Sequence, residues 1–317
     1  MKYLAGIDLG GTKISSAISD LSGNILYETT TPTLAEEGEE AVVERIIRSL
    51  EELIKRAKAE ATDLAFIGIG TPGIVNKKEG KILRAYNLPF IDYDLLKPLM
   101  EHFGRPCILE NDANAAALGE YQFGKGEGKK DLIYVTVSTG VGGGAVIGGK
   151  LLEGSTGNAF EVGHMIIDPK SDIKCNCGLY GDLEALASGT AITKRAIEAR
   201  ETAEETLLKQ FDKITPKEVY EAYLRGDQVS EEILKDAFSY IGVACANLIT
   251  LYNPEVLVLG GGVSSIGDFF FDSVRSSAKR NCLDFLFGAC EILPSGLGKD
   301  TGLKGALAVA KMGFESL

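Results

Sequence analysis

Three glycine-rich turns, each directly after an apolar, strand-like segment, constrain the fold of this chain more than any other feature. They are residues 8–13 (DLGGTK), 138–144 (STGVGGG) and 259–264 (LGGGVS). Because glycine lacks a Cβ, the backbone N–H groups of such turns can approach an anion closely. A single turn of this kind is more often a plain β-hairpin, so both interpretations stay open for each turn taken alone.

The polar residues of the first two turns suit phosphate binding. The hydroxyls of Thr12, Ser138 and Thr139 can donate hydrogen bonds to phosphate oxygens. Asp8 only accepts hydrogen bonds when ionised, so it suits a phosphate site when a cation such as Mg²⁺ lies between them. No turn has the spacing of a P-loop, G-x-x-x-x-G-K-[ST], or of a dinucleotide fingerprint, G-x-G-x-x-G, opening a helix. Those two nucleotide-binding folds are therefore disfavoured. Lys13 is left unassigned.

Hydropathy patterns predict an α/β chain in which one architecture occurs twice. Each half opens with a strand, a glycine- and threonine-containing turn and a second strand, from about residues 2 and 131. The glycine-rich, charged segment 123–130 is the best hinge candidate between the copies. Helices are predicted over 38–61, 95–104, 190–200, 215–225, 230–252 and 267–280, in an alanine-rich segment after residue 112, and from about 302.

The composition of the chain limits the classes of binding partner and the cellular compartment that we expect. The chain has 317 residues, enough for two domains, and a net charge of −12, which argues against nucleic acid as a partner. No secretory signal is visible, and no apolar stretch approaches the ~20 residues that span a bilayer, so we expect a cytoplasmic protein without a membrane partner. Four of the six cysteines are expected to be buried small hydrophobes rather than disulfides: Cys107, Cys245, Cys282 and Cys290.

These turns resemble those of the superfamily of sugar kinases, 70-kDa heat-shock proteins and actin. Four further motifs, 110–120 (ENDANAAALGE), 161–165 (EVGHM), 175–184 (CNCGLYGDLE) and 253–264 (NPEVLVLGGGVS), resemble the ROK family over the whole chain, and within it the glucokinase-like members. The resemblance implies a two-lobed actin-like ATPase (ribonuclease H-like) fold with an interlobe cleft. Residues 1–113 plus 301–317 would form the small N-terminal lobe, and 114–300 the large C-terminal lobe.

Within the motif 110–112, Asp112 matches the catalytic base of the family. A carboxylate suits this role because a sugar hydroxyl is a poor nucleophile until its proton is accepted during phosphoryl transfer. The alternative from the residues alone is that Asp112 simply caps the alanine-rich helix that follows.

The resemblance also implies binding roles for two further groups of residues. The sugar ligands, besides Asp112, would be Asn87, Asn111, Glu161, His164 and Glu184. The ATP and Mg²⁺ ligands would be Asp8, Gly10, Gly11 and Thr12 in the first loop, Thr139, Gly140, Gly142 and Gly143 in the second, and Gly261 and Gly262 beside the adenosine. Family members often have Asn-Leu-Pro-Gly-Trp where this chain has Asn87 followed by Leu-Pro-Phe, and the chain contains no Trp.

The family's structural zinc site is altered in this chain. The family pattern is C-x-C-G-x-x-G-C-x-E with an upstream His, and Asp182 stands where the third Cys is expected. Zinc also accepts carboxylate oxygen, so His164, Cys175, Cys177 and Asp182 are predicted to bind Zn²⁺, more weakly than a three-Cys site. The alternative is a metal-free loop with two free thiols.

The resemblance therefore predicts an ATP-dependent hexose kinase, with glucose phosphorylated at O6. Kinases for fructose, mannose, allose or an N-acetylated amino sugar share the same residues and stay open, as does polyphosphate as donor. A repressor is not expected, because no helix-turn-helix module precedes Asp8. A non-catalytic sugar sensor is the alternative of another class, and a homodimer or homotetramer is expected from the family.

Overall fold

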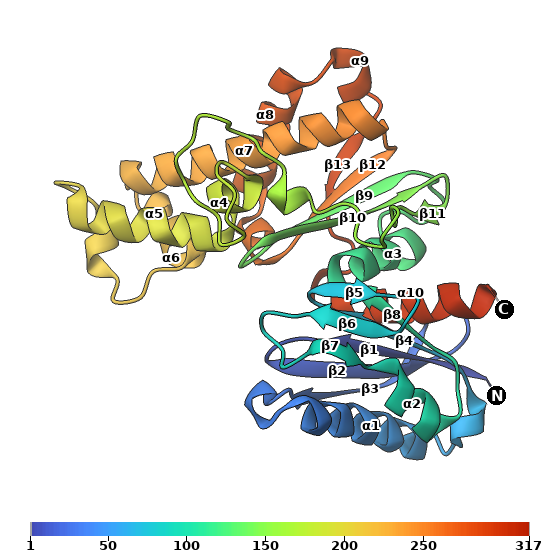
Figure 1. Ribbon diagram of the computed structural model, residues 1–317. Coiled ribbons are helices and arrows are strands. Elements are labelled where there is room, and N and C mark those ends of the chain that lie inside the picture. The colour runs from blue at the N-terminus through green and yellow to red at the C-terminus, as the bar shows by residue number, and fades with distance from the viewer. Residues whose placement is uncertain (1, 317) are drawn as a thin grey trace.

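Two five-stranded sheets with the same connectivity organise the chain, as the computed structural model shows over residues 2–316 (Figure 1). In each sheet the first three strands are antiparallel, and two later strands extend it in parallel. The N-terminal sheet has the order β3-β2-β1-β4-β8: Ile25–Pro32, Lys13–Ser19, Tyr3–Leu9, Leu64–Thr71 and Cys107–Asn111. The C-terminal sheet has the order β11-β10-β9-β12-β13: Lys150–Leu151, Val141–Ile147, Leu132–Val137, Val256–Gly260 and Glu291–Pro294. The predicted repeat of architecture is therefore present.

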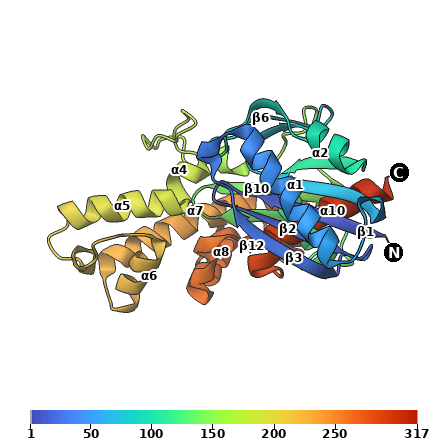
Figure 2. The same ribbon diagram turned by 90° about the horizontal axis from the view of Figure 1, so that it is seen from below.

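Helices cover the sheets as their apolar periodicity requires. In α1 (Glu39–Arg56), Val42, Ile46, Leu50 and Leu53 are fully buried on one face, which packs across β2 and β3 (Figure 2). The C-terminal sheet is covered by a helical group in which α7 (Gln228–Tyr252) and α8 (Asp268–Asn281) pack closely together. The remaining helices of that part are α4 (Leu183–Ala187), α5 (Gly189–Thr202), α6 (Pro216–Leu224) and α9 (Asp284–Phe287).

The last helix, α10 (Thr301–Glu315), returns to the N-terminal sheet and packs on β1, β4 and α3 (Asp112–Phe123). In Figure 1, α3 and α10 lie between the two sheets. The contact needs glycine, because a Cβ on Gly68 would lie 2.3 Å from the nitrogen of Ala310. The lobe limits 1–113 plus 301–317 and 114–300 stay a prediction.

A third, three-stranded sheet escaped the sequence analysis. Strands β5 (Ile74–Asn76), β6 (Lys81–Arg84) and β7 (Ile91–Asp94) pair antiparallel, and helix α2 (Leu96–Phe103) follows them. Each strand has only three or four residues, too few to show a clear period of two. Val75, Ile82 and Phe90 are fully buried and join the core beneath the N-terminal sheet.

The burial of the cysteines and of the apolar helix α7 can be compared with the expectations from the sequence. Cys245 and Cys290 are buried as expected, whereas Cys107 and Cys282 are only half-buried; all six cysteines are free thiols. Among the described residues, α7 is the one helix with the length and composition to cross a membrane, which the search for apolar stretches did not single out. Most of its apolar side chains are buried in the core around the C-terminal sheet, and this packing accounts for its hydropathy.

Substituting Gly68→Ala is expected to lower the free energy of unfolding by about 1–3 kcal/mol, because the new methyl group meets the backbone of α10 rather than a movable side chain. Chemical denaturation at equilibrium measures the change. Gly288→Ala is the control, since its Cβ meets a single atom at 3.2 Å and its backbone is already right-handed helical. Equal effects of the two substitutions would contradict the prediction.

Candidate active site

The junction of β8 and α3 presents Asp112. Asn111 is the N-cap of α3: its Oδ1 accepts hydrogen bonds from the backbone N–H groups of Ala113 (2.9 Å) and Asn114 (3.3 Å). Its amide group donates to the carbonyl oxygen of Gly73 at 3.3 Å, so one of its N–H bonds is left over for a ligand. Asn111, not Asp112, is therefore the N-cap of α3, although Oδ1 of Asp112 also accepts from the N–H of Ala113 at 2.9 Å.

Asp112 faces a pocket of about 120 Å³ that it shares with Glu161, Asn158, Asn111, Gly142 and Gly143. The pocket thus unites residues that the motifs had assigned to catalysis, sugar and phosphate. Two glycines of the second loop also serve packing here. A Cβ added to Gly142 would lie 3.3 Å from the Cβ of Ala113, and one added to Gly143 would lie 2.7 Å from the side chain of Val162. These glycines therefore let β10 approach the first turn of α3 and the segment that carries Glu161.

A strained turn carries Glu161. Phe160, directly before it, has φ +73°, a left-handed conformation that is rare for an aromatic residue. The N–H of Val162 donates to the carbonyl oxygen of Phe160 at 2.7 Å, closing a tight three-residue turn around Glu161. Packing of Phe160 against Tyr252, with ring centroids 5.5 Å apart, holds the turn in place. Such strain is typical of functional sites.

Carboxylates gather around the pocket, and their pKa values are raised. Protein atoms line the pocket around Asp112, although its side chain is still exposed to water. The partial loss of hydration raises the pKa of Asp112. Burial and then the charge of Asp112 raise the pKa of Asp8 to about 6, against the opposing charge of Lys13. Burial and the charges of Asp112 and Glu184 raise the pKa of Glu161, although His164 acts in the opposite direction. Such a site favours protons, cations or hydroxyl donors.

Asp8 approaches the N-terminus of α10, where a Cβ on Gly302 would lie 2.2 Å from its Oδ2. The first loop around it is a true hairpin turn, because the N–H of Gly10 donates to the carbonyl oxygen of Lys13 at 2.9 Å. Gly11 lies against Asn87, whose backbone oxygen would be 2.8 Å from a Cβ there. The fold therefore brings the predicted first phosphate loop into contact with the predicted sugar ligand Asn87. Thr12 follows at the exposed tip of the turn.

The second loop is a hairpin turn as well, held from both sides. The N–H of Val141 donates to Oε2 of Glu184 at 2.9 Å, and that oxygen leaves no room for a Cβ on Gly140. On the other side, the hydroxyl of Thr190 donates to the carbonyl oxygen of Thr139 at 2.8 Å. The N-terminus of α5 and the predicted sugar ligand Glu184 thus fix the geometry of the second predicted phosphate loop.

A pocket of about 480 Å³ adjoins this loop and reaches Gly262. Gly261 has φ +88° and lies against β9, because a Cβ on it would be 2.3 Å from the carbonyl oxygen of Val137. The third glycine-rich turn therefore ends beside the second. The hairpin interpretation does not hold for this third turn, since β12 runs into a short 3₁₀ helix, Gly262–Ile266.

The predicted metal ligands lie together. The ligand atoms of His164, Cys175, Cys177 and Asp182 all lie within 4.8 Å of one another. Asp182 Oδ2 is 3.1 Å from Nδ1 of His164 and 3.4 Å from Sγ of Cys177, close to the ~3.3–3.8 Å between ligands of a tetrahedral zinc. Its Oδ1 accepts from the N–H of Ala185 at 2.8 Å and caps α4. These residues therefore fit a Zn²⁺ ion.

A family model described as "ROK family" matches residues 4–312. The chain belongs to the ROK family. It is 35% identical to the glucokinase of Halalkalibacterium halodurans over 96% of this chain and 93% of that protein, and 34% identical to the glucokinase of Thermotoga maritima over 97% of each. The xylose repressor of Caldicellulosiruptor bescii is 33% identical over 86% of this chain but only 69% of the repressor.

Solved ROK structures share the fold. The ROK hexokinase from Thermus thermophilus superposes with a TM-score of 0.87 at 34% identity, over 99% of this chain and all (100%) of the other. A ROK family glucokinase from Streptomyces griseus, solved in complex with glucose and AMPPNP, superposes with a TM-score of 0.79 at 34% identity, over 98% of this chain and 99% of the other. The family and the two-lobed actin-like fold predicted from the motifs are confirmed.

Several pocket residues of this ROK protein escaped the sequence analysis. Asn158 lines the Asp112 pocket, and Thr190, Lys194 and Thr215 line the larger pocket beside the second loop. The signal in the sequence was weak: Thr190 and Thr215 stand at or next to helix starts, where hydroxyl residues are common for capping alone.

Asp8→Asn is expected to raise the free energy of unfolding at pH 7.5 by about 2 kcal/mol. The pKa of Asp8 is raised in the folded state, so ionising this carboxyl costs stability as pH rises from about 4 to about 6, and the cost persists above that range. Urea denaturation of both proteins at pH 7.5 and 4.0 measures the difference, which should shrink at the lower pH. A variant less stable than the parent at pH 7.5 would contradict the prediction.

Proposed function

We propose that this ROK protein is an ATP-dependent hexose kinase that phosphorylates glucose at O6. The observation that carries the proposal is the position of Asp112. This carboxylate lies in the first turn of α3 without being its N-cap, and it is open to a polar pocket beside the second glycine-rich loop. The two glucokinases at 34–35% identity and the glucose–AMPPNP complex of the related enzyme support it.

In the proposed reaction, Asp112 accepts the proton of the glucose O6 hydroxyl as O6 attacks the γ-phosphorus. The O6–phosphorus bond forms, the bond between the γ-phosphorus and the β,γ-bridging oxygen breaks, and ADP leaves with that oxygen. The raised pKa of Asp112 suits this role, since a base works best with a pKa closer to the working pH.

Sugar recognition falls to the carboxylates and amides around Asp112. Glu161, Glu184 and His164 would face the ring, with Asn87 and Asn111 supplying amide groups. Hydroxyl groups satisfy carboxylates that lack partners, so a sugar without the matching hydroxyl would leave a desolvated charge unpaired. The assignment of the individual hydroxyls depends on this chemistry and on the family resemblance.

The nucleotide would occupy the two hairpin turns and the larger pocket. Thr12 and Thr139 would donate to phosphate oxygens, as would backbone N–H groups at the tips of the two turns such as those of Gly11 and Gly140, while the N–H of Gly10 stays bonded to Lys13 and that of Val141 to Glu184. Gly261 and Gly262 would lie beside the adenosine. Asp8 suits a Mg²⁺ ion, because its carboxylate is desolvated and stands near a second carboxylate. When bound, Mg²⁺ neutralises charge on the transferring phosphate.

A sugar-responsive regulator is the second candidate, because a xylose repressor matches most of this chain. The pocket favours catalysis, since a sensor needs no base beside a phosphate loop.

We further propose a cytoplasmic homodimer or homotetramer that binds neither nucleic acid nor membranes. Light scattering tests the oligomeric state, and DNA-binding assays test the lack of nucleic-acid binding.

The test of the kinase is ADP release with Mg·ATP and a panel of glucose, mannose, fructose, allose, N-acetylglucosamine, N-acetylmannosamine or no sugar. Glucose should give the highest kcat/KM. Asp112→Asn should lower kcat by about 10²–10⁴-fold and keep glucose binding in calorimetry, since only the proton acceptor is lost. Asp272→Asn, an exposed carboxylate on α8, is the matched control. A flat panel would contradict the proposal, and near-parental turnover of Asp112→Asn would contradict its base.

Zn²⁺ is proposed as a structural ion held by His164, Cys175, Cys177 and Asp182. Protein purified without chelator should contain about one zinc per chain, and Asp182→Ala should lose most of it, because one of four ligands is gone. Asp172→Ala, an exposed carboxylate in the same loop, is the control, and Asp182→Cys should bind more tightly. Elemental analysis well below one zinc per parent chain would contradict the proposal.

A further inference from the structure

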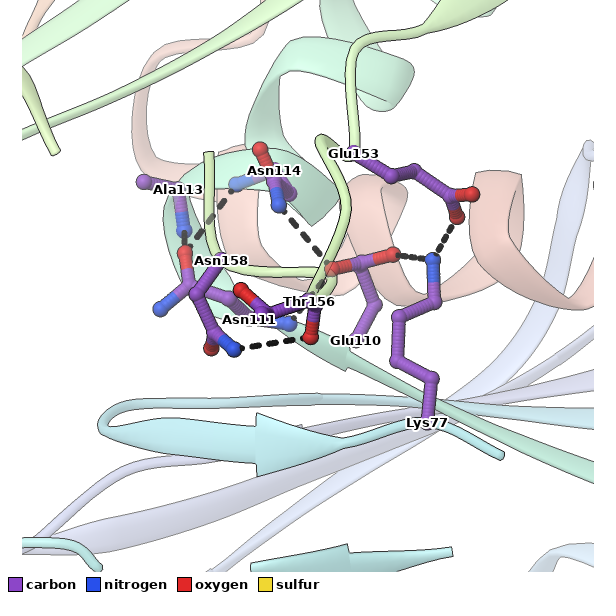
Figure 3. A network of polar contacts seen from close by, with 8 residues as sticks. All are labelled: Lys77, Glu110, Asn111, Ala113, Asn114, Glu153, Thr156 and Asn158. Carbon is purple, nitrogen blue, oxygen red and sulfur yellow. Dashed lines mark hydrogen bonds and ion pairs between the residues drawn. The ribbon is translucent and has the colours of Figure 1, made fainter. Parts of the chain in front are cut away.

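Lys77 joins two carboxylates that come from different parts of the fold. It lies in the turn between β5 and β6, and it forms ion pairs with Glu110 at the end of β8 and with Glu153 in the segment after β11 (Figure 3). The Lys77 side chain is 14% exposed, Glu110 is fully buried and Glu153 is half exposed. Burial disfavours the charge on Lys77, but Glu110 and then Glu153 outweigh it and raise the pKa of Lys77.

Glu110 links Lys77 to the turn that presents Asp112. Its Oε1 accepts hydrogen bonds from the backbone N–H of Asn111 at 2.9 Å and from Nδ2 of Asn114 at 3.0 Å. These two residues stand on either side of the Asp112–Ala113 pair, so one buried carboxylate holds both ends of the turn. A buried carboxylate needs a counter-charge, and among the described residues Lys77 is the cation paired with it.

Glu153 links Lys77 to the segment that covers the same pocket. Its carbonyl oxygen accepts from the N–H of Ala159 at 3.1 Å, and Asn158 and Glu161 in this segment line the Asp112 pocket. A cavity of about 630 Å³ separates the segment from the turn that bears Lys77. The ion pair spans this opening, and it anchors a segment that ends in the strained turn at Phe160.

We propose that Lys77 is a positioning residue that links the turn carrying Asp112 to the 153–161 segment. The link keeps the base and the sugar-facing Glu161 at fixed positions relative to each other. This inference rests on the proposed kinase function. Because Lys77 lines neither the Asp112 pocket nor the larger pocket beside the second loop, it acts through Glu110 on the base and through Glu153 on the sugar side.

The experiment compares glucose kinetics and hydrogen exchange of Lys77→Met, Lys77→Arg, Glu153→Ala and Lys78→Met with the parent. Lys77→Met should lower kcat by about 10–100-fold, since small misplacements of a catalytic group cost this much. Lys77→Arg, which keeps the charge, should restore most of it. Glu153→Ala should raise the KM for glucose and leave kcat within about 2-fold, because Glu110 keeps its partner. Lys78→Met removes a charge from a neighbour outside this ion-pair network and should match the parent.

Amide exchange of the protein without ligands separates this proposal from the kinase function. Glu153→Ala should speed exchange in peptides covering 153–161 only, whereas Lys77→Met should also speed it in peptides covering 110–114. If Lys77→Met is poorly folded, Lys77→Met with Glu110→Gln removes the unpaired charge and should still speed exchange over 153–161. Unchanged exchange in both peptides with parental kcat and KM would overturn the proposal. A parent protein without glucose-dependent ADP release would overturn the kinase function. The exchange pattern would still test whether Lys77 links the 110–114 turn to the 153–161 segment.

Discussion

The close contact of α3 with its surroundings is the constraint on which the rest of the structure depends. A Cβ on Gly305 would lie 2.7 Å from the carbonyl carbon of Ala115, and one on Gly144 would lie 2.9 Å from the carbonyl oxygen of Ala113. Glycine and alanine at these positions let the backbones of α10 and β10 touch α3 from two sides. Because α3 is held between the two sheets in this way (Figure 1), its first turn stays fixed, and Asp112 is the first residue of that turn.

Charge in the pocket follows from the same packing. Protein atoms around Asp112, Asp8 and Glu161 partly desolvate these carboxyls, so the pKa of each of the three is raised. A fold that only needed stability would avoid such a cluster. In the proposed kinase, a bound cation and sugar hydroxyls would compensate for the free-energy cost of holding these carboxylates together.

The sugar and phosphate sides are mechanically joined through Glu184. Its Oε2 accepts from the N–H of Val141 in the second loop, and its Oε1 lies 3.8 Å from Sγ of Cys175 in the metal cluster. A zinc ion on His164, Cys175, Cys177 and Asp182 would therefore order the residue that supports a phosphate loop. Asp182, which stands at the position of the usual third Cys, would keep a ligand in place because its carboxylate also caps α4.

The sequence by itself determined most of the element order, the duplicated architecture, the family and the motif residues, because periodicity, glycine-rich turns and motif spacing are local properties. It did not reveal the sheet of β5, β6 and β7, whose strands are too short to show a period, or the pocket residues Asn158 and Lys194. Only the tertiary structure decided that Asn111 rather than Asp112 is the N-cap of α3, that Gly11 meets Asn87, and that Lys77 bridges Glu110 and Glu153. The physical reason is that each of these contacts joins backbone or charged groups whose partners are chosen by three-dimensional packing, and no spacing along the chain encodes that choice.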